Sequence, residues 1–375
     1  MADYTIYDLT VSVLTPLHIG TGKELLNQYD YAIHSGRTWR LNEGALLDAQ
    51  DVEDAAMAAK LAIIPPAQLL EAPHDYRPDN GLFRYVLHGT PRSEAEGAQL
   101  REQIKDVFDR PYLPGSSLKG ALRTAIAWNV WQHGQMRPEI RKVGRRRQWA
   151  AQTYEREIFG PDPNHDFLRA LHVSDSAPID ADRLLLLNAS VMNRRGSPGA
   201  PIEMEAIAPD TQFSLTLKVD DALFSEWAVA NRLRLNGQEF LTDLPSAVQN
   251  HSLALARQEV AWFKDIGPAR QIAGFYQQLA GSRPGARRFL ISLGWGTGWT
   301  SKTFGSHLQS DADFMERILR DHRLARGRRQ RGDPFPKSRR VVVQISRDRQ
   351  GRPVENPAAP MGWCLVEMKE RTHDS

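Results

Sequence analysis

Alternating hydrophobic and polar positions mark the predicted strands of this chain. Over residues 4–15, Leu9, Val11 and Val13 fall on one side of the backbone, which predicts a half-buried strand. The same period of two predicts a strand over residues 212–219, and residues 29–33 and 38–41 predict a hairpin that turns at Ser35-Gly36. Shorter apolar segments predict further strands over residues 82–87, 168–174, 184–192, 288–293, 341–345 and 362–367.

Segments with helical spacing or composition separate these strands. Leu118, Leu122 and Ile126 share one face of a helix that is predicted to start after Pro114-Gly115 and to run to about residue 133. A long helical segment over residues 246–280 is expected to break near Gly267-Pro268. Further helices are predicted over residues 44–63, 94–107 and 311–325.

This order of elements predicts an α+β fold. Short strands mixed with few helices favour two packed α+β sandwiches over a doubly wound parallel sheet. With 375 residues, the chain is long enough for two closely packed domains. We expect an N-terminal domain over residues 1–205 that carries insertions, and a C-terminal domain over residues 206–375 that carries a glycine-rich loop.

The composition is that of an ordinary globular protein, with 41% hydrophobic and 25% charged residues. Cys364 is the single cysteine, so an intramolecular disulfide and a zinc site built on paired cysteines are both excluded. Residues 1–8 have neither a basic segment nor an apolar core, so no signal peptide is predicted. No apolar run reaches the length of a membrane span, and we expect a cytoplasmic protein without a membrane partner.

Basic residues gather in two segments although the formal net charge is only +3. Residues 137–147 contain six Lys or Arg against Glu139, and residues 323–340 contain eight against Asp333. Local basic concentration on a nearly neutral chain favours a polyanionic partner such as nucleic acid. Solvated charge runs are the alternative interpretation of either segment.

The segment from Pro114 to Arg123 is a candidate phosphate site. Ser116 or Ser117 is expected to cap the first helical turn, where unpaired backbone N–H groups attract anions. Lys119 and Arg123 are four residues apart, so they lie on one side of the helix and can reach an adjacent phosphate. An ordinary serine-capped helix with a solvated basic face is the alternative.

A second candidate site is the loop in which Gly294, Gly296 and Gly298 alternate with tryptophan and threonine. It lacks the second glycine of a P-loop, because Ser301 precedes Lys302, so nucleoside triphosphate binding is not predicted. The loop can still hold an RNA backbone against its N–H groups, with Lys302 on a phosphate and a tryptophan stacked on a base. A tight turn with both tryptophans in the core is the alternative.

His18 and Asp30 are the candidates for RNA cleavage. A histidine can act as a general base on a 2′-hydroxyl, and an aspartate can hold a metal ion for phosphodiester hydrolysis. For neither residue does the spacing of the sequence identify a second acid, base or metal ligand, so we predict no catalytic residue and no metal site. Arg194 and Arg195, on a finger rich in glycine and proline over residues 193–201, are expected to contact RNA or a neighbouring subunit.

Three separated motifs resemble the RAMP superfamily, the RNA-binding proteins of CRISPR effector complexes. They are residues 15–22 (Thr-Pro-Leu-His-Ile-Gly-Thr-Gly), residues 112–123 with the intact pattern Pro-Gly-Ser-Ser-x-Lys-Gly-x-x-Arg, and the loop at residues 294–298. Residues 294–303, 335–340 and 360–363 are similar to the type III-A (Csm) subunit that caps the complex at the 3′ end of the guide RNA.

The resemblance implies tandem ferredoxin-like (RRM-like) domains, binding to the 3′ region of crRNA, and stacking on the last backbone subunit. It implies as partners crRNA, target RNA, other Csm subunits including the backbone RAMP subunit, and maturation nucleases, with no cofactor. A RAMP endoribonuclease that uses His18 or Asp30, and a RAMP subunit of a Cmr complex, remain the alternatives. The predicted RNA-binding residues are His18, Gly20, Gly22, Ser116, Ser117, Lys119, Arg123, Arg194, Arg195, Gly294, Gly296, Gly298 and Lys302.

Overall fold

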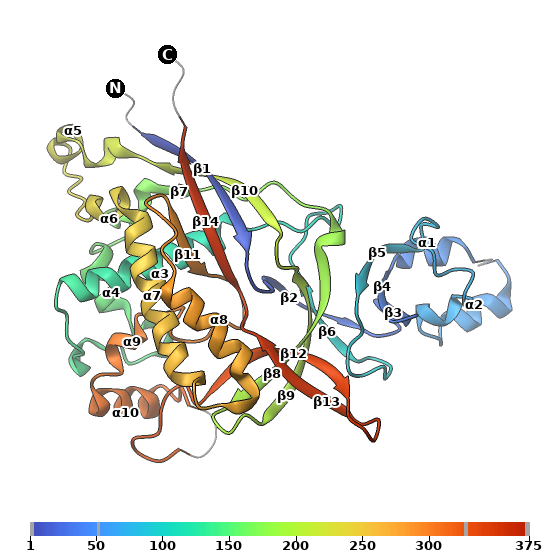
Figure 1. Cartoon of the computed structure of the whole chain (residues 1–375). Helices are drawn as coiled ribbons and strands as arrows, with labels where there is room; N and C mark the ends of the chain where they lie inside the picture. The colour runs from blue at the N-terminus through green and yellow to red at the C-terminus, as the bar shows by residue number, and fades with distance from the viewer. Residues whose placement is uncertain (1–3, 51–52, 326–328, 372–375) are drawn as a thin grey trace.

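A five-stranded antiparallel sheet joins segments from both ends of the chain. The structure is a computed structural model that describes residues 4–50, 53–325 and 329–371. The strand order is β11–β14–β1–β10–β7, so the N-terminal strand β1 is the central strand and lies between the C-terminal strand β14 and β10 (Figure 1). The strands span Thr5–Val13 (β1), Leu171–Val173 (β7), Gln212–Val219 (β10), Arg288–Ser292 (β11) and Trp363–Glu370 (β14).

A second sheet of nine strands continues away from the first. Its main path is β2–β6–β9–β8–β5–β4–β3, and the hairpin β12–β13 joins it through β8. The strands span Gly20–Leu26 (β2), Tyr31–His34 (β3), Arg37–Leu41 (β4), Phe83–His88 (β5), Gln99–Gln103 (β6), Leu184–Asn193 (β8), Pro198–Ile207 (β9), Ser338–Arg347 (β12) and Pro353–Ala359 (β13). Strands β3, β4 and β5, with helices α1 (Glu43–Asp48) and α2 (Ala55–Leu61), form a lobe at one end of the molecule (Figure 1).

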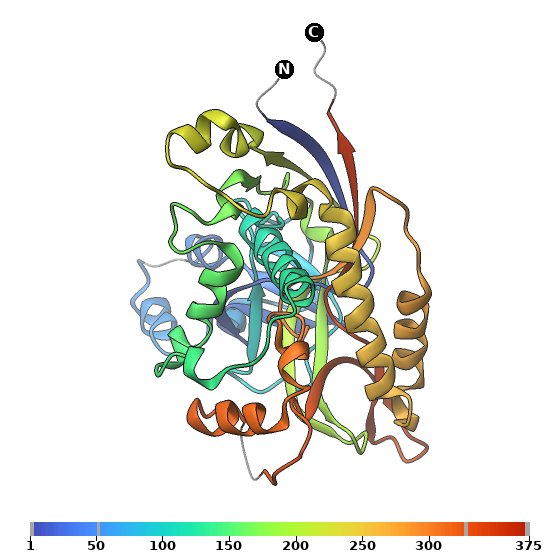
Figure 2. The ribbon, with the colours of Figure 1, turned by 90° about the vertical axis from the view of Figure 1, so that its left-hand side faces the viewer.

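Two long helices cover the five-stranded sheet. Helix α3 (Gly115–His133, teal) and helix α7 (Leu244–Phe263, gold) lie side by side in Figure 2, and Asn129 Nδ2 on α3 donates to Ala247 O on α7 at 2.6 Å. The expected apolar face of α3 is buried together with Leu9 and Val11 of β1, which places the main core between helices and sheet. The other helices are α4 (Gln152–Phe159), α5 (Glu226–Ala230), α6 (Gln238–Thr242), α8 (Arg270–Gly281), α9 (Gly305–Leu308) and α10 (Ala312–Asp321).

The α+β prediction and most predicted elements are confirmed. The strands expected over residues 4–15 and 212–219, the hairpin at Ser35-Gly36 and the helix break near Gly267-Pro268 are all present. The helix predicted over residues 94–107 is wrong, because residues 99–103 form β6, which pairs with β2 and β9. Strands β2, β9 and β13 were not predicted.

Both sheets combine strands from the two predicted domains. β1 pairs with β10 and β14, and β12 pairs with β8. The predicted boundary between residues 205 and 206 falls inside β9, and the division into two domains stays a prediction. Among the described residues, no helix combines the length and the apolar character that crossing a membrane requires.

Candidate RNA interface

Three loops that are far apart in the sequence meet at one place, which we call the loop junction: residues 14–20, 293–299 and 360–363. Trp295 N donates to His18 O at 2.7 Å, which joins the first two loops. Leu293 N donates to Gly362 O at 2.7 Å, and Gly362 N donates to Pro16 O at 2.9 Å. The motifs that carried the family resemblance at the two ends of the chain are therefore one structural unit.

The glycines of this junction allow the loops to approach each other. Gly294 has a φ of +72°, and a Cβ at this position would lie 2.4 Å from His18 O. At Gly296, with a φ of +88°, a Cβ would lie 2.7 Å from Met361 Sδ. Gly298 also has a positive φ, +94°, but a Cβ there would meet no atom within 4 Å. Protein atoms thus occupy the space next to Gly294 and Gly296, and Gly298 is the glycine of this loop that faces open space.

His18 lies beneath the junction and not on its surface. Its side chain is 2% exposed, and Nδ1 lies 2.7 Å from Glu205 O, so Nδ1 carries the proton and donates. Burial lowers the pKa of His18 to about 4, so the ring is neutral at pH 7. The predicted RNA contact of this ring would need the loop to open.

A buried carboxylate fixes the strands below His18. Glu205 is fully buried and accepts hydrogen bonds from Tyr85 Oη at 2.6 Å, Gln103 N at 2.9 Å and Lys105 Nζ at 2.5 Å. These donors come from β5, β6 and the residues just after β6, so one carboxylate connects them to β9. The buried charge is compensated by Lys105, which is the condition for placing a carboxylate in a core.

Trp295 lies next to two arginines at the junction. The Cζ atom of Arg101 lies 4.9 Å from the centroid of the Trp295 ring, and that of Arg340 lies 4.8 Å from it. The ring also meets the edge of His18, with centroids 6.3 Å apart. An indole beside two guanidinium groups combines a stacking surface with positive charge, which is the chemistry that single-stranded RNA requires.

The start of α3 differs from the expected serine cap. The helix begins at Gly115, with Pro114 at the N-cap position, so Ser116 and Ser117 lie inside the first turn. Gly115 N donates to Asp175 Oδ1 at 2.7 Å, which means that a carboxylate of this chain already interacts with the helix N-terminus. The expectation of a serine cap is wrong. The hydroxyl group of Ser116 is exposed, and among the described residues neither serine side chain has a hydrogen-bond partner.

The two basic residues of this helix also have partners within the protein. Lys119 Nζ donates to Leu171 O at 2.6 Å, and burial lowers its pKa. Arg123 Nη1 donates to Asp166 at 2.7 Å, and its Cζ atom lies 3.6 Å from the centroid of the Phe159 ring. The side chains therefore serve the packing of α3, and their contact with phosphate stays a prediction.

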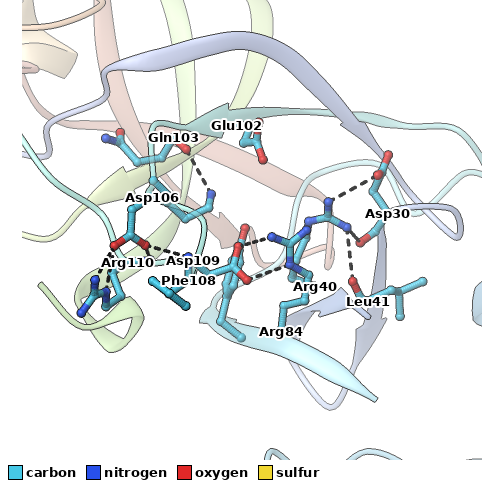
Figure 3. A network of polar contacts seen from close by, with 12 residues as sticks. Asp30, Arg40, Leu41, Arg84, Glu102, Gln103, Asp106, Phe108, Asp109 and Arg110 are labelled. Carbon is cyan, nitrogen blue, oxygen red and sulfur yellow. Dashed lines mark hydrogen bonds and ion pairs between the residues drawn. The ribbon is translucent and has the colours of Figure 1, made fainter. Parts of the chain in front are cut away.

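Asp30 is a structural turn residue. Its Oδ2 atom accepts a hydrogen bond from Leu26 N at 2.8 Å, and its Oδ1 atom lies 3.5 Å from Arg40 Nη2 (Figure 3). Among the described residues, no group of three or more His, Cys, Asp or Glu side chains has the arrangement of a metal site. The carboxylate oxygens of Asp30 are engaged in holding the turn that leads into β3.

The turn over residues 106–110 exposes two apolar side chains. Asp106 and Arg110 form an ion pair at 2.7 Å across the turn, and Arg84 pairs with Asp109 at 2.6 Å (Figure 3). Val107 and Phe108, between these pairs, are 87% and 73% exposed.

The basic segment over residues 323–340 is largely neutralised. Acidic residues from other elements pair with it: Glu316 with Arg329, Asp313 with Arg331, and Glu259 with Arg339. Two of the eight predicted basic residues, Arg326 and Arg328, lie outside the described residues. This segment is therefore less cationic than its sequence indicates.

Other predicted cations remain on the surface. In the segment over residues 137–147, Arg145, Arg146 and Arg147 are exposed, and no described acid pairs with them. Arg194 and Arg195 are exposed at the turn between β8 and β9. Lys302 follows the glycine-rich loop; it is exposed, and surrounding protein lowers its pKa by desolvation.

Comparison with known proteins decides the family. The model of the RAMP superfamily matches residues 10–300, which is most of the chain. The chain belongs to the RAMP superfamily. This RAMP protein is 25% identical over 314 residues to the Csm5 protein of Methanocaldococcus jannaschii, with 79% of this chain and 72% of that protein covered. It is 26% identical to Csm5 of Streptococcus thermophilus over 242 residues, covering 59% of this chain and 66% of that protein.

Solved structures show the same fold. A chain of a Csm–crRNA–target RNA ternary complex of a type III-A system matches with a TM-score of 0.68 and 24% identity, covering 97% of this RAMP protein and 100% of that chain. The crystal structure of T. onnurineus Csm5 matches with a TM-score of 0.67 and 25% identity, covering 96% and 99%. The expected resemblance to the RAMP subunits of type III-A (Csm) complexes is confirmed.

The sequence did not reveal the arginines beside Trp295 of this RAMP protein. Arg101 lies in the segment that was expected to be helical, and Arg340 was one member of a basic run. Asp175, which occupies the N-terminus of α3, had no signal either. Only the pairing of β6 and β12 into the second sheet places the two arginines, and no local pattern encodes that pairing.

Proposed function

We propose that this protein is an RNA-binding structural subunit of a type III-A CRISPR ribonucleoprotein, which binds the 3′ region of crRNA and caps the filament of backbone subunits. Its relatives are Csm5 proteins, and a protein of the same fold belongs to a Csm–crRNA–target RNA complex. The observation that carries the RNA-binding part is the proximity of Arg101 and Arg340 to the Trp295 ring at the loop junction.

The chemistry of this junction suits the backbone and stacked bases of RNA. Guide and target pair with each other by base pairing, so a subunit of such a complex needs to hold backbone and shape and does not read sequence. A guanidinium group binds a phosphate oxygen and stacks on an aromatic ring, and an indole stacks on any base. The open side of Gly298 and the exposed Arg194 and Arg195 are the proposed continuation of this surface.

In this proposal the partners are crRNA, target RNA, the backbone RAMP subunit and the other Csm subunits, with maturation nucleases as further partners. The protein supports crRNA maturation by covering the RNA end and thereby setting where trimming stops. This role requires contact with one end of the guide only.

Site-specific crosslinking in a reconstituted complex tests the capping role. Guide RNAs carry 4-thiouridine in either the 5′ region or the 3′ region, and the crosslinked subunit is identified by mass spectrometry. We expect this chain to crosslink to the 3′ label and not to the 5′ label. Complexes assembled without it are expected to carry guides with altered 3′ ends. Crosslinking to the 5′ label alone would contradict capping of the 3′ end, and no crosslink to either label would contradict RNA binding.

A further inference from the structure

A half-enclosed cavity of about 610 Å³ lies between α3, α4 and the segment that follows the glycine-rich loop. Its size is within the range of small-ligand sites. Its lining includes Arg123 of α3, Arg147 at the end of the basic segment over residues 137–147, Trp149 just after that segment, and Trp299 and Lys302 just after Gly298. The cavity thus brings together three segments that the sequence marked as basic or RNA-binding.

Two cations of this cavity have no acidic partner. Arg123 is paired with Asp166 and also lies 3.6 Å from Glu155, which lines the cavity. Arg147 and Lys302 also line the cavity, and among the described residues neither makes an ion pair or a side-chain hydrogen bond. Desolvation by the surrounding protein also lowers the pKa of Lys302.

The aromatic walls of the cavity differ in how they are packed. Trp299 meets the edge of Phe335, with centroids 5.0 Å apart, and belongs to the protein core on that side. Trp149 is 49% exposed, and no described ring stacks on it. A half-exposed indole next to unpaired cations offers one stacking face and one anion site within a single small cavity.

We propose that this cavity binds one nucleotide of single-stranded RNA, with the base against Trp149 and the phosphate on Lys302 and Arg147. This inference rests on the proposed RNA-binding function and adds a second contact, separate from Trp295 at the loop junction. Trp295 and Trp299 are four residues apart in the glycine-rich loop, so the same loop supplies a wall to each site. In this proposal, an RNA strand that crosses the glycine-rich loop contacts both sites.

Isothermal titration calorimetry of the full chain with AMP, adenosine and inorganic phosphate tests the nucleotide site. We expect AMP to bind about tenfold more tightly than adenosine, because the phosphate adds charge-assisted hydrogen bonds. Lys302→Ala should weaken AMP about tenfold and leave adenosine unchanged, whereas Lys302→Arg should retain most of the affinity. Trp149→Leu should weaken AMP and adenosine equally.

Lys264→Ala is the matched control, since Lys264 is exposed, without a partner among the described residues, and outside the cavity. Circular dichroism of each variant checks that the fold is intact. AMP binding that survives both Lys302→Ala and Trp149→Leu would overturn the proposal, as would phosphate binding as tightly as AMP or no binding of AMP at millimolar concentration. If the chain binds AMP in this way but does not bind single-stranded RNA, the result would support the nucleotide site and contradict the proposed RNA-binding function.

Discussion

Trp295 N donates a 2.7 Å hydrogen bond to His18 O, and this bond ties the glycine-rich loop to a loop 277 positions earlier in the chain. Gly294 makes the bond possible, because any side chain there would collide with the same carbonyl group. The relationship explains why two glycine-punctuated motifs at opposite ends of the sequence occur together. Each loop forms the surface against which the other packs.

Substitution at Gly294 is expected to destabilise the protein more than substitution at Gly298. Both glycines have positive φ, so alanine costs about 1–2 kcal/mol at either position. At Gly294 the new Cβ would also lie 2.4 Å from His18 O, whereas at Gly298 it would meet nothing within 4 Å. We expect Gly294→Ala to lower the free energy of unfolding by at least ~1 kcal/mol more than Gly298→Ala. Urea titration of both variants measures the difference, and equal losses would contradict the packing role of Gly294.

The arginines that flank Trp295 are expected to contribute to RNA affinity through charge. Arg101→Ala combined with Arg340→Ala should weaken binding to single-stranded RNA and flatten the salt dependence by roughly one unit per lost phosphate contact. Affinity is measured by fluorescence anisotropy over a range of salt concentrations, with several unrelated sequences. Arg283→Ala is the control, because Arg283 is exposed and has no partner among the described residues. If the double variant is folded and its salt slope is unchanged, the result would contradict the placement of Trp295 at the RNA interface.

Much of the fold was predictable because its strands carry a local signal. Leu9, Val11 and Val13 alternate with polar residues, and the structure buries all three in the core. The structure of residues 99–103 was not predictable in this way. Their local composition suggests a helix, and they form a strand because they pair with β2 and β9. Propensity is a weak guide where the partner strands are distant in the sequence.

The candidate site was predictable in its motifs and not in its contacts. The glycine loops were recognised from the sequence, but their approach to each other depends on long-range strand pairing. Asp175 interacts with the start of α3 from a position 60 residues away, and Asp166 pairs with Arg123 from 43 residues away. Acidic partners of this kind cannot be assigned from the spacing of the basic residues, so the positive charge of a run is overestimated from sequence.

Substitutions at the start of α3 separate its structural role from contact with phosphate. Asp175→Ala removes the carboxylate that accepts from Gly115 N and is expected to cost about 1 kcal/mol of unfolding free energy. Ser116→Ala should leave stability unchanged, because the hydroxyl has no partner among the described residues. If phosphate binds at this turn, Ser116→Ala lowers RNA affinity, and Asp175→Ala raises it by removing a repelling charge. No change in affinity for either variant would assign the turn to folding alone.

Lys119 and Arg123 are expected to affect stability as well as affinity. Lys119→Ala with Arg123→Ala removes the hydrogen bond to Leu171 O and the ion pair with Asp166. We therefore expect a lower melting temperature together with weaker RNA binding and a flatter salt slope. Thermal unfolding and anisotropy on the same preparation distinguish the two effects. A loss of stability without any change in the salt slope would contradict phosphate binding by these two residues.

Protonation of His18 is expected to destabilise the fold in mild acid. Burial lowers its pKa from 6.5 to about 4 in the folded protein, so the unfolded chain binds the proton more readily. The neutral ring contributes its full stability above pH 6.5, and this contribution falls by about 3 kcal/mol as the pH decreases to 4. His18→Asn preserves a donor to Glu205 O without a titrating group. Its unfolding free energy should fall less between pH 7 and pH 4 than that of the wild type, and parallel pH profiles would contradict the assignment.

RNA cleavage by this chain is not expected. Purified protein incubated with labelled guide precursor or target RNA, with and without Mg²⁺, should leave both intact. The reason is geometric: the imidazole of His18 is buried against Glu205 O, and the carboxylate of Asp30 is held by Leu26 N and Arg40. His18→Asn keeps a donor for Glu205 O, and Asp30→Asn keeps an acceptor for Leu26 N but removes the ion pair with Arg40, so circular dichroism of the second variant checks that its fold is intact. Cleavage that is present in the wild type and lost in either variant would establish a RAMP endoribonuclease. Cleavage that persists in both variants would point to a contaminating nuclease or to a different site.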